Sequence, residues 1–296
     1  MRVRNAARLR LLAAAALFST GGALIKSCAF NGWQVAGLRS AIASVTILAV
    51  APAARRRWSW RVFLVGAAYA ATLVLYVIGN KLTTAASAIY LQATAPLYLL
   101  VLAPLLLKEP LSARDGKFML ALGAGMLLLL AGTEAPRATA PDPVHGNMLA
   151  LASGVTWALT LLGLRWMGRF GDDAVAATAA GNLLAALVCA PWALPLPPAP
   201  AADWARIVFL GVVQIGLAYA LLARGIREVP ALESSLLVLL EPVLNPIWAW
   251  LVHGETLGPL TALGAAAIFG ATTAHVAAGF RGRKPLEQSA LPFVPD

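Results

Sequence analysis

The sequence predicts an all-α integral membrane protein with ten transmembrane helices, arranged as two inverted five-helix repeats. Three observations predict this fold: an apolar composition, ten apolar stretches of membrane-spanning length, and Lys and Arg residues concentrated in alternate loops. Apolar residues make up 60% of the 296 residues and charged residues only 12%, whereas a soluble domain carries about 25% charged residues. The chain is therefore expected to fold in lipid.

The apolar stretches fit the roughly 30 Å hydrocarbon core of a bilayer at about 1.5 Å rise per residue. Four Arg residues precede the first stretch, as in a signal peptide. A second apolar stretch follows directly after Lys26, so the first is more simply a transmembrane helix. The predicted spans are residues 9–27, 33–51, 62–82, 85–107, 118–132, 147–164, 174–194, 204–223, 231–252 and 260–280.

The basic residues predict the orientation of these spans. Of the 23 Lys and Arg residues, 18 fall on one side of the predicted membrane and four on the other, while Arg39 lies inside a span. Cytoplasmic loops retain basic residues, so both termini are expected to be cytoplasmic. The net charge of +10 then reflects membrane topology, and nucleic acid is not an expected partner.

An internal repeat divides the chain. We expect a first repeat at residues 1–132, an external linker at 133–146, a second repeat at 147–280 and a disordered cytoplasmic tail at 281–296. Each half holds an odd number of spans, so the second half enters the membrane from the opposite side. A shift of 146 residues superposes Trp58 on Trp204, Phe63 on Phe209, Ala85 on Ala231, Pro96 on Pro242 and Glu109 on Glu255.

Several short elements resemble the EamA-type transporters of the drug/metabolite transporter superfamily. They are Leu38-Arg39, the segment from Pro96 to Lys108-Glu109-Pro110, Pro242, Trp248-Ala249-Trp250 and the run His253-Gly254-Glu255-Thr256-Leu257. Within this family the overall likeness is greatest to the YddG-type exporters of aromatic amino acids. The resemblance implies a bacterial inner-membrane protein whose two repeats surround a central cavity, which is exposed alternately to each side.

The same resemblance implies that predicted helices one, three, four, six, eight and nine line the cavity. Aromatic and polar side chains on these helices are candidates to bind an aromatic substrate by stacking and hydrogen bonding. Trp157 lies near the middle of its span, too far from the membrane–water interface to belong to an interfacial aromatic belt. Helix packing is the alternative to a binding role. Tyr76 and Asn80 share one helix face, and Tyr98 follows Pro96 at an expected helix distortion. Tyr90 and Tyr219 complete the predicted site, and Gln92, Gln214 and Asn245 are further polar candidates.

Prolines and buried charges suggest how the protein works. Pro96 and Pro242 interrupt helical hydrogen bonding at equivalent places in the two halves, so we expect them to act as hinges. A charged side chain inside the membrane costs roughly 2.5–3.5 kcal/mol. Arg39 is expected to anchor carbonyl groups or a carboxylate, as a structural charge. Glu241 either carries a coupling proton or hydrogen-bonds backbone groups freed by Pro242.

The sequence also lacks several functional motifs. It contains no H-E-x-x-H, G-x-S-x-G or Walker A motif and no Cys/His metal cluster, which argues against an enzyme, a cofactor or a metal. We therefore expect a transporter that exports aromatic and other bulky neutral amino acids. The alternatives are a broader drug or metabolite exporter, or a membrane scaffold or enzyme. The expected partners are amino acids and membrane lipid, and the chain is expected to be a monomer or weak dimer.

Overall fold

The computed structural model describes residues 2–55, 58–107, 113–229 and 231–281. The predicted Lys108-Glu109-Pro110 element and the tail from residue 282 lie outside these residues. The described residues form helices, turns and one isolated bridge between Arg137 and Ala140. The helices before the linker are α1 (Arg2–Ser19), α2 (Gly21–Ser27), α3 (Gly32–Val50), η1 (Pro52–Arg55), α4 (Trp60–Leu82), α5 (Ala85–Gln92), α6 (Ala95–Leu107) and α7 (Ala113–Ala131). After it come α8 (Pro143–Gly168), α9 (Ala174–Ala193), α10 (Ala201–Val208), η2 (Phe209–Leu217), α11 (Ala218–Glu228), α12 (Ala231–Val238), α13 (Leu240–His253) and α14 (Pro259–Arg281).

Polar caps set where several of these helices begin. Asn31 and Gln34 form a capping box at the start of α3, in which each side chain accepts a hydrogen bond from the other residue's backbone N–H. The Ser59 and Asp173 side chains likewise accept backbone N–H groups at the starts of α4 and α9. Such caps satisfy N–H groups that the helix itself leaves free, so they fix the points at which the chain re-enters the bundle.

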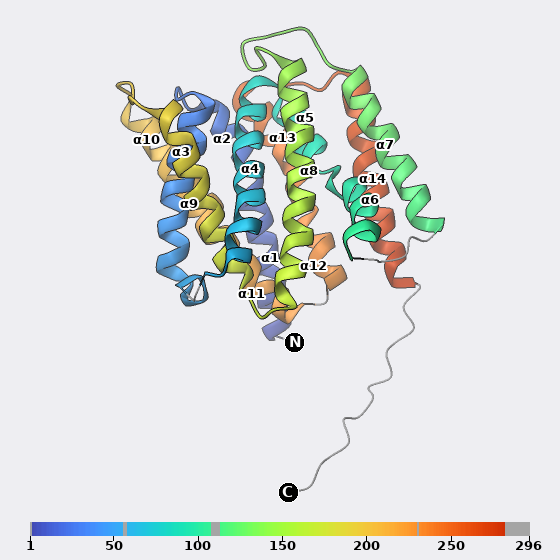
Figure 1. Cartoon of the computed structure of the whole chain (residues 1–296). Helices are drawn as coiled ribbons and strands as arrows, with labels where there is room; N and C mark the ends of the chain where they lie inside the picture. The colour runs from blue at the N-terminus through green and yellow to red at the C-terminus, as the bar shows by residue number, and fades with distance from the viewer. Residues whose placement is uncertain (1, 56–57, 108–112, 230, 282–296) are drawn as a thin grey trace, which may run out of the picture.

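The long helices stand side by side, and the beginning of α1 and the end of α14 lie at the same end of the bundle (Figure 1). α3 packs on α9, α7 packs on α14, and α4 contacts both α8 and α9. Eight helical segments among the described residues are long and apolar enough to cross a membrane. They cover all the predicted spans except 118–132 and 231–252, where the structure has α7 and the α12–α13 pair, so the number ten stays a prediction.

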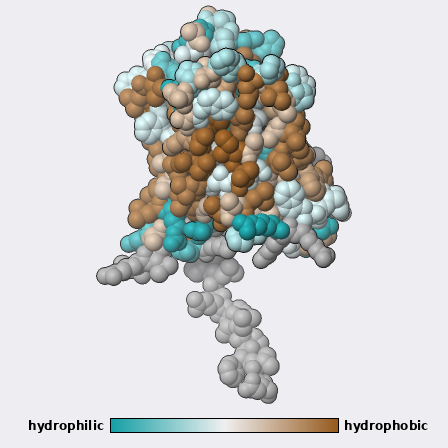
Figure 2. All heavy atoms as spheres, turned by 90° about the vertical axis from the view of Figure 1, so that its left-hand side faces the viewer, coloured by the Kyte–Doolittle hydropathy of each residue, from teal (hydrophilic) through white to brown (hydrophobic). Residues whose placement is uncertain are grey.

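The surface fits a lipid environment. Figure 2 shows a broad apolar band across the middle of one face of the molecule, with hydrophilic residues gathered at both ends. Large apolar side chains such as Val45, Leu187 and Val188 are exposed, Val45 to 68%. A soluble monomer rarely exposes so much contiguous apolar surface, so the band indicates a multi-pass membrane protein.

Three of the predicted spans are broken near the middle. α1 gives way to α2 at Thr20, α5 gives way to α6 at Ala93 and Thr94, and α12 gives way to α13 at Leu239. Span 204–223 contains the π-helix η2, a rare form often found at functional sites. The distortion expected at Pro96 is confirmed, since Pro96 lies in the first turn of α6, where its missing N–H costs nothing. Pro242 likewise lies in the first turn of α13.

Candidate functional site

The broken helices surround a cavity of about 360 Å³, which is within the range for small-molecule sites. It is bounded by the helix breaks of α5–α6 and α12–α13, and by parts of α1, α3, α4, α8, η2, α11 and α14. Most of its lining is apolar or aromatic. The lining residues are Phe18, Arg39, Tyr69, Thr72, Leu73, Tyr76, Ile89, Tyr90, Gln92, Ala93, Ala95, Pro96, Trp157, Leu161, Gln214, Ile215, Tyr219, Leu222, Val238, Leu239, Glu241, Pro242, Ile268, Phe269 and Thr272.

Aromatic rings from four segments meet on one side of this cavity. Tyr69 on α4 donates a hydrogen bond to the Tyr219 hydroxyl of α11, with 2.8 Å between the oxygens. Phe18 packs edge-on against Tyr219 with 5.0 Å between ring centroids. Trp157 on α8 lies 6.2 Å from the Tyr69 ring. These spacings favour edge-to-face packing of further rings, so the cluster provides a surface for an aromatic ligand.

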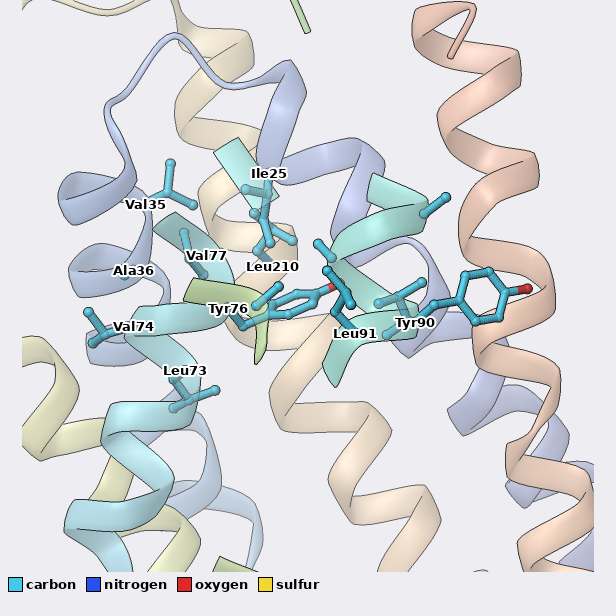
Figure 3. Close-up of a cluster of buried hydrophobic side chains, with 14 of the residues drawn as sticks. Ile25, Val35, Ala36, Leu73, Val74, Tyr76, Val77, Tyr90, Leu91 and Leu210 are labelled. Atoms are coloured by element: carbon cyan, nitrogen blue, oxygen red, sulfur yellow. The ribbon is translucent and has the colours of Figure 1, made fainter. Parts of the chain in front are cut away.

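Tyr76 and Tyr90 extend the aromatic lining. Figure 3 shows them on α4 and α5, with the Tyr76 ring pointing inward and Tyr90 projecting on the side of α14. Both belong to the main apolar core, together with Leu73, Val77 and Leu91. The core therefore holds the two phenols in place while they face the cavity.

Two charged side chains, Arg39 and Glu241, also line the cavity. Arg39 on α3 is only 2% exposed, and its Nε has no hydrogen-bond partner. The anchoring contact expected for Arg39 is not found among the described residues. No ion pair joins Arg39 to Glu241, although the structure describes both. The cavity therefore holds one basic and one acidic side chain that are not joined in an ion pair.

Three buried amides lie beside the same region. The Asn80 and Asn245 side chains lie near the Tyr76 hydroxyl. None of their side-chain nitrogen and oxygen atoms makes a hydrogen bond of ordinary geometry. The Gln214 amide nitrogen donates to the Phe18 carbonyl over 3.3 Å, whereas its Oε1 has no partner. Buried polar atoms are usually satisfied, and of these three amides only Gln214 lines the cavity.

The predicted site residues are mostly brought together. Trp157, Tyr76, Tyr90, Tyr219, Arg39, Glu241, Pro96 and Pro242 all line the cavity. Asn80 is fully buried behind Tyr76 and does not line it. Tyr98 does not line it either, because its hydroxyl lies 3.9 Å from Met126 Sδ on α7. Tyr69 and Phe18 were not among the predicted residues, although Tyr69 stands two turns before Tyr76 on one helix face.

A buried ion pair closes the opposite end of the bundle from the start of α1. Lys26 Nζ on α2 lies 3.1 Å from Glu255 Oε1, and both side chains are 4% exposed. Lys26 also donates to the Thr83 carbonyl over 2.5 Å and to the Thr139 carbonyl. The second carboxylate oxygen of Glu255 accepts the Ala85 N–H at 2.9 Å. The Lys26–Glu255 contact thus joins α2, the α4–α5 turn, the linker and the end of α13.

The backbone at the end of α13 places Glu255 for this role. Gly254 has a φ of 63°, a left-handed conformation that glycine adopts without strain. Its N–H bonds to the Trp250 carbonyl, which ends the helix. His253, one residue earlier, lies 2.9 Å from the Ala23 carbonyl and 3.2 Å from Ser27 Oγ. α2 and α13 are therefore tied together along the last turn of each.

Ion pairs at the end of the bundle where α1 begins are nearer the surface. Arg10 pairs with Glu228 at 2.9 Å, and both side chains are more than a third exposed. Arg61 Nε donates to Asp172 over 2.5 Å. This hydrogen bond holds the pKa of Asp172 below its usual value. An exposed pair such as Arg10–Glu228 contributes little to stability. No group of three or more His, Cys, Asp or Glu residues among the described residues is placed to hold a metal ion.

Comparison with known proteins assigns the family. A solved crystal structure, titled only "Crystal structure of protein", resembles this one with a TM-score of 0.62 at 23% identity and covers 95% of this chain and 100% of its own, which shows the fold alone. Uncharacterized protein PA1977 of Pseudomonas aeruginosa is 34% identical over 146 residues, which are 48% of this chain and 47% of that protein. The EamA-like transporter family matches at residues 7–131 and 144–275. The chain therefore belongs to the EamA-like transporter family.

Proposed function

We propose that this transporter exports amino acids, mainly aromatic and other bulky neutral ones, by alternating access. The observation that carries the proposal is the 360 Å³ cavity, in which aromatic rings, the Gln214 amide and the acidic and basic side chains of Glu241 and Arg39 meet inside a membrane protein. Aromatic rings suit an apolar or aromatic side chain, and the polar groups suit the amino and carboxylate groups.

The proposed architecture is ten crossings in two inverted repeats. Its support is the two separate family matches, one in each half of the chain. Further support comes from the pairing of α3 with α9 and of α7 with α14, since predicted helices two and five then pack on their own counterparts. The equivalent positions of Pro96 and Pro242 after helix breaks agree with the same symmetry.

The proposed location is the bacterial inner membrane, with the start of α1 and the end of α14 in the cytoplasm. The support is the excess of Lys and Arg on that side of the predicted membrane. In this orientation the Lys26–Glu255 contact closes the external side. Export then requires that contact to separate, while bending at Pro96 and Pro242 moves the halves of the broken helices.

The test is counterflow of radiolabelled phenylalanine into proteoliposomes preloaded with unlabelled amino acids. Wild-type uptake is expected to require internal aromatic amino acids and to fall at least tenfold in Trp157→Ala. A matched control is Trp250→Ala, because Trp250 is 57% exposed on α13 and does not line the cavity. Absence of counterflow with every amino acid contradicts the proposal and favours a broader metabolite exporter.

A further inference from the structure

We propose that Arg39 and Glu241 recognise the two charges of a zwitterion, Arg39 binding the carboxylate and Glu241 the ammonium group of an amino acid whose side chain packs on the aromatic cluster. This inference rests on the proposed function and names how the same cavity selects its substrate. It assigns to both residues a binding role in place of the structural or proton-coupling roles expected from the sequence.

The cavity lining includes one basic and one acidic side chain. Among the described lining residues, Arg39 alone has a basic side chain and Glu241 alone a carboxylic acid. An unpaired charge in a poorly solvated site is costly, and a complementary charge on a ligand offsets that cost. A cation would be repelled by Arg39 and an anion by Glu241. A zwitterion satisfies both groups and leaves the occupied cavity neutral.

Arg39 and Glu241 both lie near the tyrosines of the cavity. Tyr69, Tyr76 and Tyr219 each lie within electrostatic reach of both Arg39 and Glu241. The two charged groups therefore border the same aromatic surface, and they do not meet in an ion pair. A ligand held between them places its apolar side chain against these rings, where edge-to-face packing is available.

Two residues of the cavity lining have a polar atom without a hydrogen-bond partner in the protein. Arg39 Nε is a buried donor without an acceptor, and Gln214 Oε1 is a buried acceptor without a donor. Gln214 also lines the cavity. A carboxylate supplies acceptors for a guanidinium, and an ammonium group supplies three donors. An amino-acid zwitterion therefore offers acceptors to the Arg39 guanidinium and donors to the acidic and amide side chains of the lining.

The test measures how well three compounds displace radiolabelled phenylalanine from the purified protein in detergent. The competitors are unlabelled phenylalanine, 2-phenylethylamine, which lacks the carboxylate, and 3-phenylpropanoate, which lacks the amine. Wild type is expected to prefer phenylalanine at least tenfold over either analogue. Arg39→Gln should lose the preference over 2-phenylethylamine and keep the other, whereas Glu241→Gln should lose the preference over 3-phenylpropanoate alone.

Two further variants keep the test decisive. Arg10→Gln removes a surface charge outside the cavity and should leave both preferences unchanged. Arg39→Lys keeps the charge and should retain a preference over 2-phenylethylamine, which covers the case in which Arg39→Gln does not fold. Wild-type preferences that persist in both cavity variants overturn the inference while amino-acid binding stands. A wild type that binds no phenylalanine overturns the proposed function itself, and the inference with it.

Discussion

Buried charged side chains occur in two regions of this molecule, and they form an ion pair in only one of the two. At the closed end, Lys26 and Glu255 face each other at 3.1 Å and bond to the surrounding backbone. In the cavity, Arg39 and Glu241 are not joined in an ion pair, and Arg39 Nε has no hydrogen-bond partner. A buried ion pair stabilises one arrangement of helices, whereas charged side chains that are not paired with each other leave interactions for a ligand. We therefore interpret the Lys26–Glu255 pair as a structural contact and the region of Arg39 and Glu241 as a binding site.

The largest expected effect on stability comes from breaking the Lys26–Glu255 ion pair. Lys26→Met leaves the Glu255 carboxylate buried without its counter-ion, so we expect a loss of about 3–5 kcal/mol in unfolding free energy. Chemical unfolding in detergent measures it. Arg10→Met is the matched control, because the exposed Arg10–Glu228 pair is worth about 0–1 kcal/mol. Equal losses in the two variants would contradict the structural role of the Lys26–Glu255 contact.

The double variant Lys26→Met/Glu255→Met sharpens this result. Replacing both buried charges by apolar groups is often neutral or stabilising, so the double variant should recover most of the stability lost in Lys26→Met. Transport by the double variant, measured as phenylalanine counterflow, shows whether the ion pair is needed for the external side to close. A double variant as unstable as Lys26→Met would mean that local packing matters more than charge pairing.

Removing an unpaired charge should have a smaller effect on stability. Arg39→Met deletes a buried charge that has no ion-pair partner in the described residues, so its unfolding free energy is expected to equal or exceed that of wild type, within about 1 kcal/mol. The same unfolding measurement in ligand-free detergent tests this. A loss as large as that of Lys26→Met would show that Arg39 has a structural partner after all.

A still more local effect is expected in the aromatic cluster. Tyr69→Phe removes the hydrogen bond to the Tyr219 hydroxyl, which should cost about 0.5–1.5 kcal/mol. Tyr69→Phe/Tyr219→Phe should lose no more than the single variant, because the same bond is absent in both. Additive losses in this double-mutant cycle would show that the two hydroxyls act separately.

The smallest effect concerns pH at the exposed end. Arg61 holds the pKa of Asp172 below its usual value through a hydrogen bond. The stabilisation by this pair is therefore complete above the ordinary range of an Asp carboxyl, and it is lost as the pH falls through the lowered pKa. Asp172→Asn should flatten the dependence of melting temperature on pH below about pH 4. Arg61→Gln should flatten it equally, and an unaltered profile in both variants would contradict the prediction.

The sequence predicted helices well because apolar length alone specifies a transmembrane segment. Residues 62–82 and 174–194, for example, were expected as spans and form α4 and α9. Of the helix breaks, those just before Pro96 and Pro242 were expected from the two prolines. The π-helix η2 carries no proline between Phe209 and Leu217, and nothing in its local sequence marks it. It packs against α3.

The candidate site was predicted only in part, for a similar reason. Trp157 and Tyr76 stood out because aromatic residues in the middle of a span need a reason to be there. Tyr98 was expected beside them, but the break between α5 and α6 turns it toward Met126. The Lys26–Glu255 contact joins distant parts of the chain, so no local pattern announces it.

The most direct test of the account is the shift in melting temperature that phenylalanine causes in detergent, measured for wild type and for Arg39→Met. A ligand that binds only the folded protein raises its apparent stability. We predict that phenylalanine raises the melting temperature of wild type and not that of Arg39→Met, while the ligand-free variant melts at or above the wild-type temperature. An Arg39→Met protein that melts well below wild type and still responds fully to phenylalanine would contradict the account.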